Sequence, residues 1–244
     1  MRRALGILTI VLLAGTGQAR LEPEQLLERA MDHLRGSGLV ATLEITVVRP
    51  DREIRYLLEL VGDGDTAGLG RVLAPPRDAG QAFLRSDENL FLFNPRVGRV
   101  LRLPPSGRSD SFLGSDITYG DLAGRDLERD FTSAVLETTD TTVTLALTAR
   151  PDAPTPYGRV RLIIDAETLA PLEQVFEDQR GQAVRSITFL DHVDAQGRRF
   201  PTTLTVRDLT REGYATTLRY TAFAFDVDIP ANCFTQRGLE VGCR

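Results

Sequence analysis

The first hydrophobic pattern along the chain has the period of a helix. Apolar side chains recur every three or four residues at Leu26, Leu27, Ala30, Met31 and Leu34. Pro23 suits a first helical turn and Gly36 suits a C-terminal cap, so one amphipathic helix is predicted over residues 23–36. From residue 39 the period becomes two, which predicts a half-buried strand over residues 39–47.

Short strand-like runs with turn residues between them make up most of the remaining sequence. They span residues 54–60, 69–74, 81–85, 90–93, 98–103, 132–137, 142–148, 159–164, 172–178, 183–191, 200–207 and 214–225. Segment 104–130 is the exception: Pro104 and Pro105 break the sheet, and a loop with one or two short helical turns follows. We therefore predict a mainly β chain with an antiparallel sandwich or barrel, folded as one domain over residues 20–244.

The first nineteen residues have the three parts of a secretory signal. Arg2 and Arg3 precede an apolar run from Ala4 to Ala14, and small residues lead to Ala19. The run is shorter than the roughly 20 residues that span a membrane, although an uncleaved anchor is the alternative. We expect a signal peptide over residues 1–19, cleavage after Ala19 and export to the periplasm. Arg20 stands where a lipoprotein carries its acylated cysteine, so no lipid anchor is expected.

Charge and cysteine content narrow the choice of partners. All 29 basic residues are arginine. Cleavage of the signal removes Arg2 and Arg3 and leaves 27 basic against 34 acidic residues, a formal charge of −7. This negative charge argues against nucleic acid as a partner. The absence of lysine excludes Schiff-base and P-loop chemistry. Cys233 and Cys243 predict a disulfide in an exported chain, with a metal site as the weaker alternative.

A search for catalytic motifs finds almost nothing. His192 beside Asp191 is a remote hydrolase candidate, and an exposed histidine at a strand end is the ordinary interpretation. An acidic cluster could form a cation site but lacks calcium-loop spacing, so a solvated, partly helix-capping loop is favoured; it comprises Asp116, Asp121, Asp126, Glu128 and Asp130. A basic series could meet lipid phosphates or an acidic partner, or be a solvated hairpin face; it comprises Arg96, Arg99, Arg102 and Arg108. We therefore expect that the protein is not an enzyme and binds neither a metal ion nor a cofactor.

Two segments resemble a known family. LolA-like outer-membrane lipoprotein-sorting proteins resemble this chain over residues 83–95 with 98–100, and over residues 108–122. The C-terminal part of such proteins is similar to residues 228–235. The resemblance implies a LolA/LolB-like fold: an incomplete antiparallel β-barrel of about ten or eleven strands, with an N-terminal helix, short lid helices and an apolar cavity that shields acyl chains. The implied cavity residues are Phe83, Phe91, Phe93, Phe112, Leu113 and Tyr119. The alternative is a filled core.

The sequence departs from the family at one place. LolA proteins carry an arginine–proline pair before this hairpin, and that arginine helps to hold the lid shut; here residues 72–76 contain no arginine, and Ala74 stands nearest to it. The leading hypothesis is a soluble periplasmic carrier, or chaperone, of lipid or lipoprotein acyl chains, with an inner-membrane transporter and an outer-membrane acceptor as partners. The alternative is a non-catalytic interaction module that is accessory to an inner-membrane transporter and docks through the arginine hairpin.

Overall fold

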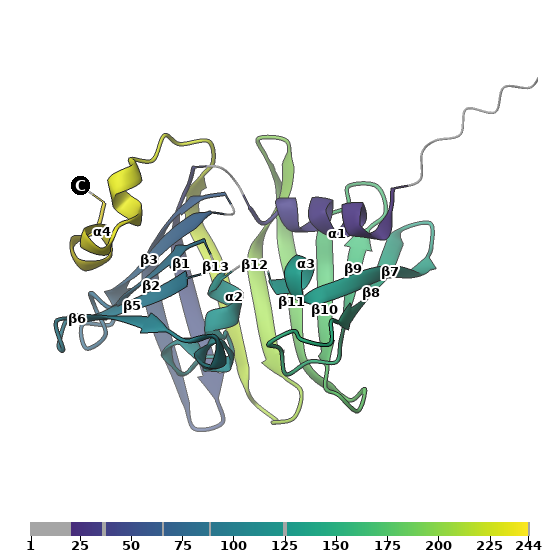
Figure 1. Cartoon of the computed structure of the whole chain (residues 1–244), viewed down its shortest axis with the longest axis horizontal. Coiled ribbons are helices and arrows are strands. Elements are labelled where there is room, and N and C mark those ends of the chain that lie inside the picture. Colours follow the sequence, from purple (N-terminus) through teal and green to yellow (C-terminus); the bar gives the residue numbers. More distant parts are fainter. Residues whose placement is uncertain (1–20, 36–37, 65, 88, 124–125, 244) are drawn as a thin grey trace, which may run out of the picture.

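A computed structural model describes residues 21–243 except 36–37, 65, 88 and 124–125. In this part of the chain thirteen strands form one curved antiparallel sheet (Figure 1). They are β1 (Leu39–Arg49), β2 (Arg52–Asp63), β3 (Ala67–Ala74), β4 (Ala82–Ser86), β5 (Asn89–Asn94), β6 (Arg99–Leu103), β7 (Phe131–Thr138), β8 (Thr142–Ala149), β9 (Arg159–Asp165), β10 (Pro171–Glu177), β11 (Ala183–Ala195), β12 (Arg198–Asp208) and β13 (Ala215–Ala224). The predicted signal peptide with its cleavage site, and the helix cap at Gly36, lie outside the described residues.

The strand order explains why the sheet is an unclosed barrel. Neighbouring strands follow the chain outward on both sides of a central β1–β13 pair, so β6 and β7 form the two free edges. These two strands are consecutive in sequence, and residues 104–130 join them. The joining segment must therefore cross the hollow of the sheet, where Figure 1 shows its short helices. We call it the lid.

The mainly β prediction is confirmed. Each of the thirteen sequence runs corresponds to one strand, because turn residues separate every pair of neighbours. The family resemblance implied about ten or eleven strands, and the sheet has thirteen. The first helix is also confirmed as α1 (Pro23–Asp32), shorter than residues 23–36.

Helix α1 is fixed to the inner, concave face of the sheet. Glu22 and Gln25 form a capping box at its start, and the buried side chains of Leu26, Leu27, Ala30 and Met31 join the main hydrophobic core. At its end the Nδ1 of His33 accepts from the Arg199 backbone N–H at 3.0 Å, while its Nε2 lies 2.9 Å from the Thr168 carbonyl oxygen. The ring thus joins the end of the helix to the turn between β9 and β10 and to the start of β12.

The lid contains short helical turns, as the sequence predicts, but the described part has four of them rather than one or two. They are the 3₁₀ turns η1 (Pro105–Ser109) and η2 (Phe112–Gly114), and the helices α2 (Tyr119–Ala123) and α3 (Asp126–Asp130). Phe112 and Ile117 are buried in the main core, so the lid packs on the inner face.

A second, smaller cluster lies on the outer, convex face of the sheet. Leu69, Ala82 and Leu84 pack there against Leu239 of α4 (Gln236–Val241), which follows the turn η3 (Ala231–Phe234). The disulfide between Cys233 and Cys243 is confirmed and closes a loop around this helix. Arg71 donates to the Gly238 and Leu239 carbonyls at 3.1 and 2.8 Å, which satisfies acceptors at the helix C-terminus.

Candidate ligand cavity and its lid

Among the residues that the structure describes, three arginine–carboxylate pairs fasten the lid to the rest of the protein. Arg49 of β1 binds Asp116 at 2.8 Å, and Arg185 of β11 binds Asp121 at 2.6 Å. Arg35, just after α1, makes two contacts with Glu128, at 2.8 and 2.7 Å. Each pair joins a lid carboxylate to an arginine on another element, so the lid is held at three separate points.

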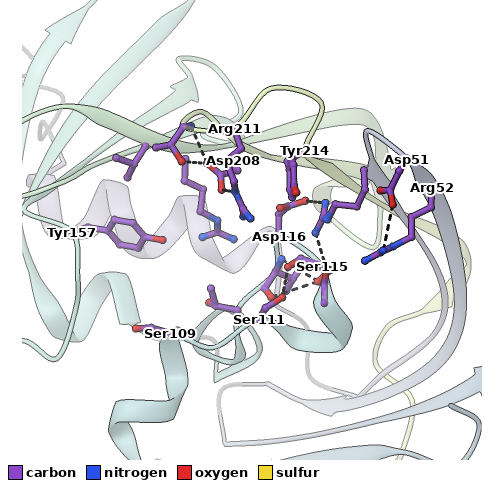
Figure 2. A pocket seen from close by; sticks show the side chains of 17 residues that line it. Asp51, Arg52, Ser109, Ser111, Ser115, Asp116, Tyr157, Asp208, Arg211 and Tyr214 are labelled. Carbon is purple, nitrogen blue, oxygen red and sulfur yellow. Dashed lines mark hydrogen bonds and ion pairs between the residues drawn. The ribbon is translucent and has the colours of Figure 1, made fainter.

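The Arg49–Asp116 pair is the most enclosed of the three. Arg49 also donates to the Gly114 carbonyl at 2.7 Å, and Asp116 accepts from the Thr216 hydroxyl of β13 at 2.7 Å. Figure 2 shows Asp116 beside the lid serines Ser111 and Ser115. Because the side chains of the pair are only 8% and 4% exposed, this end of the lid is bound to the centre of the sheet.

The Arg185 guanidinium is buried between lid and sheet. Its carbon lies 5.0 Å from the centroid of the Phe176 ring, in cation–π geometry, and two nitrogens donate to Asp121 at 3.1 and 2.6 Å. Burial acts to lower the pKa of Arg185, but the Asp121 carboxylate and the Tyr157 hydroxyl outweigh it, so the pKa is raised. Arg185 therefore stays charged while the lid covers it.

These contacts correct the interpretation of the acidic cluster as a solvated loop. Asp116, Asp121 and Glu128 bind arginines of other elements, and Asp130 is buried beside Arg129 at 2.7 Å. The side chain of Asp126 lies outside the described part. The lid aspartates attach the segment to the sheet, because the strand order brings sequence-distant arginines over it.

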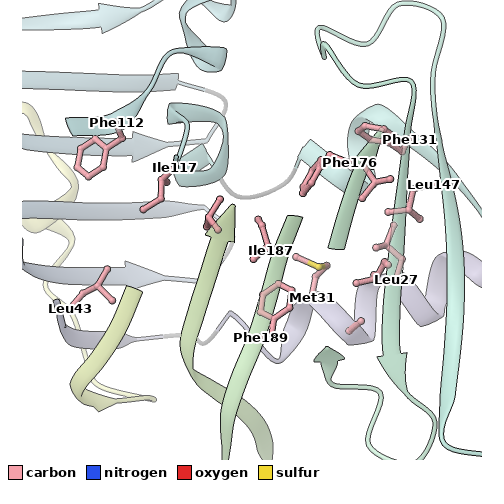
Figure 3. Close-up of a cluster of buried hydrophobic side chains, with 14 of the residues drawn as sticks. Leu27, Met31, Leu43, Phe112, Ile117, Phe131, Leu147, Phe176, Ile187 and Phe189 are labelled. Atoms are coloured by element: carbon pink, nitrogen blue, oxygen red, sulfur yellow. The ribbon is translucent and has the colours of Figure 1, made fainter. Parts of the chain in front are cut away.

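Beneath the lid, the inner face of the sheet borders an apolar cavity of about 310 Å³. The sheet supplies most of its wall, including Leu43, Ile45, Leu58, Leu60, Leu204, Val206, Leu218 and Tyr220. The lid adds Phe112, Ile117 and Leu122, α1 adds Met31, and the turn after α1 adds Leu34. Figure 3 shows Phe112 and Ile117 of the lid on one side and Met31 of α1 on the other.

A second apolar cavity of about 250 Å³ adjoins this one toward β10 and β11. Both cavities are bordered by Met31, Leu34, Asp121, Arg185, Ile187 and Leu204. The combined space falls within the range of small-molecule sites, which are mostly apolar with a few polar groups.

The structure brings four of the six predicted cavity residues together. The Phe83 and Phe112 rings meet edge to face at 5.4 Å, and Phe112 meets Tyr119 at 5.7 Å. Phe83 and Phe112 border the 310 Å³ cavity, whereas Leu113 and Tyr119 pack behind them against the core. Gly70 makes this possible, since a Cβ there would lie 2.3 Å from the Phe83 ring.

The placement of Phe91 and Phe93 in the same cavity is wrong. Phe91 pairs with Leu84 and Phe93 with Ala82, so strand alternation directs both to the outer face. There they pack against the cluster that includes Leu239. The hairpin thus carries aromatic side chains on both faces, and only Phe83 faces inward.

Sequence reasoning missed Arg185, although a signal was present. Arg185, Ile187 and Phe189 alternate along β11, so a charged side chain shares the core-facing side of the strand with two buried apolar ones. Such an arginine must find a partner, and the lid supplies it.

The remote catalytic candidate gains no support. The Nε2 of His192 lies 2.9 Å from the Pro171 carbonyl, and His192 borders neither apolar cavity. Among the described residues no group of three or more His, Cys, Asp or Glu side chains could hold a metal ion. No helix of the described ranges is long and apolar enough to cross a membrane.

A family model described as that of an uncharacterized protein matches residues 64–241, about three quarters of the chain. The chain belongs to this family. Its fold is LolA-like, as comparison with solved structures shows. A putative outer membrane lipoprotein-sorting protein domain from Vibrio parahaemolyticus has a TM-score of 0.77 at 22% identity, with 90% of this chain and 100% of that one covered.

Two further structures show the same fold. A LolA superfamily protein from Nitrosomonas europaea gives a TM-score of 0.74 at 22% identity, covering 89% of this chain and 99% of that one. A DUF1329 family protein from Desulfovibrio piger gives 0.80 at 18% identity, covering 89% and 97%. No curated protein matches the sequence.

Within this LolA-like fold, the lid is fastened without the arginine expected from the resemblance to LolA proteins. Ala74 ends β3 at the comparable position, and Arg71 of the same strand binds α4 on the outer face. Arg35, Arg49 and Arg185 hold the lid instead.

Proposed function

We propose that this protein is a non-catalytic periplasmic carrier that holds the acyl chains of a lipid or lipoprotein beneath the lid and delivers them toward the outer membrane. The observation that carries the proposal is the pair of adjoining apolar cavities between the curved sheet and a lid attached by ion pairs. The fold that the chain shares with a lipoprotein-sorting domain supports the same conclusion.

The driving force is removal of methylenes from water. Each buried methylene contributes about 0.8 kcal/mol, so ten would give about 8 kcal/mol before ordering costs, which corresponds to micromolar binding. A carrier must also release its cargo. Ion pairs suit a lid that opens, because separated arginines and carboxylates are solvated by water, whereas separated apolar surfaces are not.

Export is part of the proposal. The charged, apolar and small-residue order of residues 1–19 supports a signal peptide that is cleaved after Ala19. Intact-mass measurement of the protein from a periplasmic extract tests this. A mass that includes residues 1–19, or recovery only in detergent, would contradict it.

Displacement of a fluorescent fatty acid by palmitate tests the carrier function. Wild type should bind at micromolar concentration. Leu218→Asp should weaken binding at least tenfold, because it introduces a carboxylate into the cavity wall at a half-buried position. Leu136→Asp is the matched control: it makes the same change at a side chain 61% exposed on edge strand β7, and affinity should not change.

Folding of both variants is checked by circular dichroism. If folded wild type binds no fatty acid at tens of micromolar and co-purifies with no lipid, the carrier function is wrong. The interaction module would then be the better account of the fold.

A further inference from the structure

A polar pocket of about 690 Å³ opens beside the two apolar cavities. It lies between the lid and the turns that follow β1 and β12. Figure 2 shows Ser109 and Ser111 of the lid on one side, with Asp208, Arg211 and Tyr214 on the other. The polar pocket shares Ile117 and Arg185 with the 310 Å³ cavity. It shares Tyr157 and Arg185 with the 250 Å³ cavity. All three spaces therefore meet at Arg185.

The pocket wall carries charges of both signs in nearly equal number. Four arginines line it: Arg49, Arg52, Arg185 and Arg211. Three aspartates accompany them: Asp51, Asp116 and Asp208. A purely anionic group would meet the aspartates as well as the arginines. A ligand group that itself has both charges matches this wall better.

Two buried atoms in the wall have unused hydrogen-bonding capacity. The Nε of Arg185 and the Oδ1 of Asp116 have no hydrogen-bond partner among the described residues, although their side chains are only 8% and 4% exposed. The first is a donor and the second is an acceptor. Such atoms are costly to leave unpaired, so a ligand that offers both an oxygen acceptor and an N–H donor would satisfy them.

We propose that this pocket binds the zwitterionic head group of an acyl ligand, with a phosphate at Arg185 and a primary ammonium at Asp116, while the acyl chains enter the apolar cavities. The proposal rests on the carrier function and adds the class of ligand: a phospholipid whose head resembles phosphoethanolamine. Arg185 marks the boundary between head and chains. Arg52 and Arg211, whose side chains are 62% and 55% exposed, would add charge at the outer rim.

Three single-chain probes that share one palmitoyl group test the head preference. They are lysophosphatidylethanolamine, lysophosphatidylcholine, which has no ammonium N–H, and monopalmitoylglycerol, which has no phosphate. Each is titrated below its micellar concentration against the same bound fluorescent fatty acid. Lysophosphatidylethanolamine should bind at least tenfold more tightly than monopalmitoylglycerol and several-fold more tightly than lysophosphatidylcholine.

Two variants tie this preference to the pocket. Arg185→Lys keeps a positive charge opposite Asp121 but removes the unpartnered N–H. It should lower the ratio of the affinity for lysophosphatidylethanolamine to the affinity for monopalmitoylglycerol, a ratio that a general loosening of the lid would not change. The double variant Arg52→Gln/Arg211→Gln should also reduce the preference for lysophosphatidylethanolamine, because it removes two positive charges from the outer rim of the pocket. Arg99→Gln, an exposed arginine of β6 outside the pocket, is the control and should leave the preference unchanged.

The outcomes separate the head-group site from the carrier function. Equal binding of lysophosphatidylethanolamine and monopalmitoylglycerol would overturn the head-group site and leave the carrier intact. Equal binding of the two phospholipids would show a phosphate site without the ammonium contact, which also contradicts the proposal. If none of the three probes binds, the carrier function itself fails.

Discussion

Replacing Asp121 by Asn tests whether the ion pair with Arg185 holds the lid closed. The substitution keeps the shape of the side chain and removes its charge, while Arg185 stays beneath the lid with 8% of its side chain exposed. Breaking one partner of a fully buried pair costs about 3–5 kcal/mol. Because the Asp121 side chain is 25% exposed, we expect a smaller loss of about 2–3 kcal/mol in the free energy of unfolding.

The same change should speed ligand release. If about 1.4 kcal/mol of the loss falls on the closed lid, release of a bound fluorescent fatty acid in stopped flow should be about tenfold faster. Amide hydrogen exchange in residues 112–122 should also increase, whereas the strands of the sheet should keep their protection. Urea unfolding gives the change in stability.

The control is Asp152→Asn, which removes the same charge from an exposed loop residue. The reasoning is refuted if Asp121→Asn changes stability by less than about 0.5 kcal/mol, the range of ordinary surface substitutions, and leaves release and lid exchange as in wild type. The double variant Asp121→Asn/Arg185→Met should lose less than the sum of the single losses, because it no longer buries an unpaired charge.

Three further predictions concern stability. Cys233→Ser with Cys243→Ser should cost about 2–3 kcal/mol by releasing a loop of ten-residue separation, and equal urea midpoints with and without the bond would contradict this. Gly70→Ala should lower the free energy of unfolding by about 1–3 kcal/mol, because its Cβ would lie 2.3 Å from the Phe83 ring. Gly62→Ala is the control: its nearest contact is 3.8 Å, so stability should change by no more than about 0.5 kcal/mol. Equal losses in the two variants would refute the contact. Burial raises the pKa of Tyr220 to about 12. The stability that its neutral hydroxyl contributes is therefore complete below the unfolded pKa of about 10 and is lost as the pH rises toward 12. Tyr220→Phe should flatten this alkaline loss of stability, and an unchanged pH profile would contradict the prediction.

The sheet could be predicted from the sequence because its signals are local. Alternation along each run and turn residues between runs identify thirteen strands without any long-range information. The faces of Phe91 and Phe93 could not be predicted from alternation alone. Phe83 and Phe93 are ten residues apart across a turn, and only the register shows that Phe93 stands opposite Ala82 rather than Phe83.

The attachment of the lid could not be predicted, because it depends on contacts between distant residues. Asp116 meets Thr216 and Asp121 meets Arg185 only because the sheet brings β11 and β13 under the segment that joins its edges. The sequence shows carboxylates in a loop and arginines in strands. Their pairing follows from the strand order, which the local pattern does not contain.

The most direct test of the central claim is mapping of a photoreactive palmitate analogue bound to the purified protein. After irradiation and proteolysis, mass spectrometry identifies the labelled peptides. We predict labels on the inner-face peptides that contain Leu60 and Leu218, and on the lid peptide that contains Leu122. Labels confined to the outer-face peptides around Phe93 and Leu239, or no label that excess palmitate competes away, would contradict an acyl-binding cavity beneath the lid.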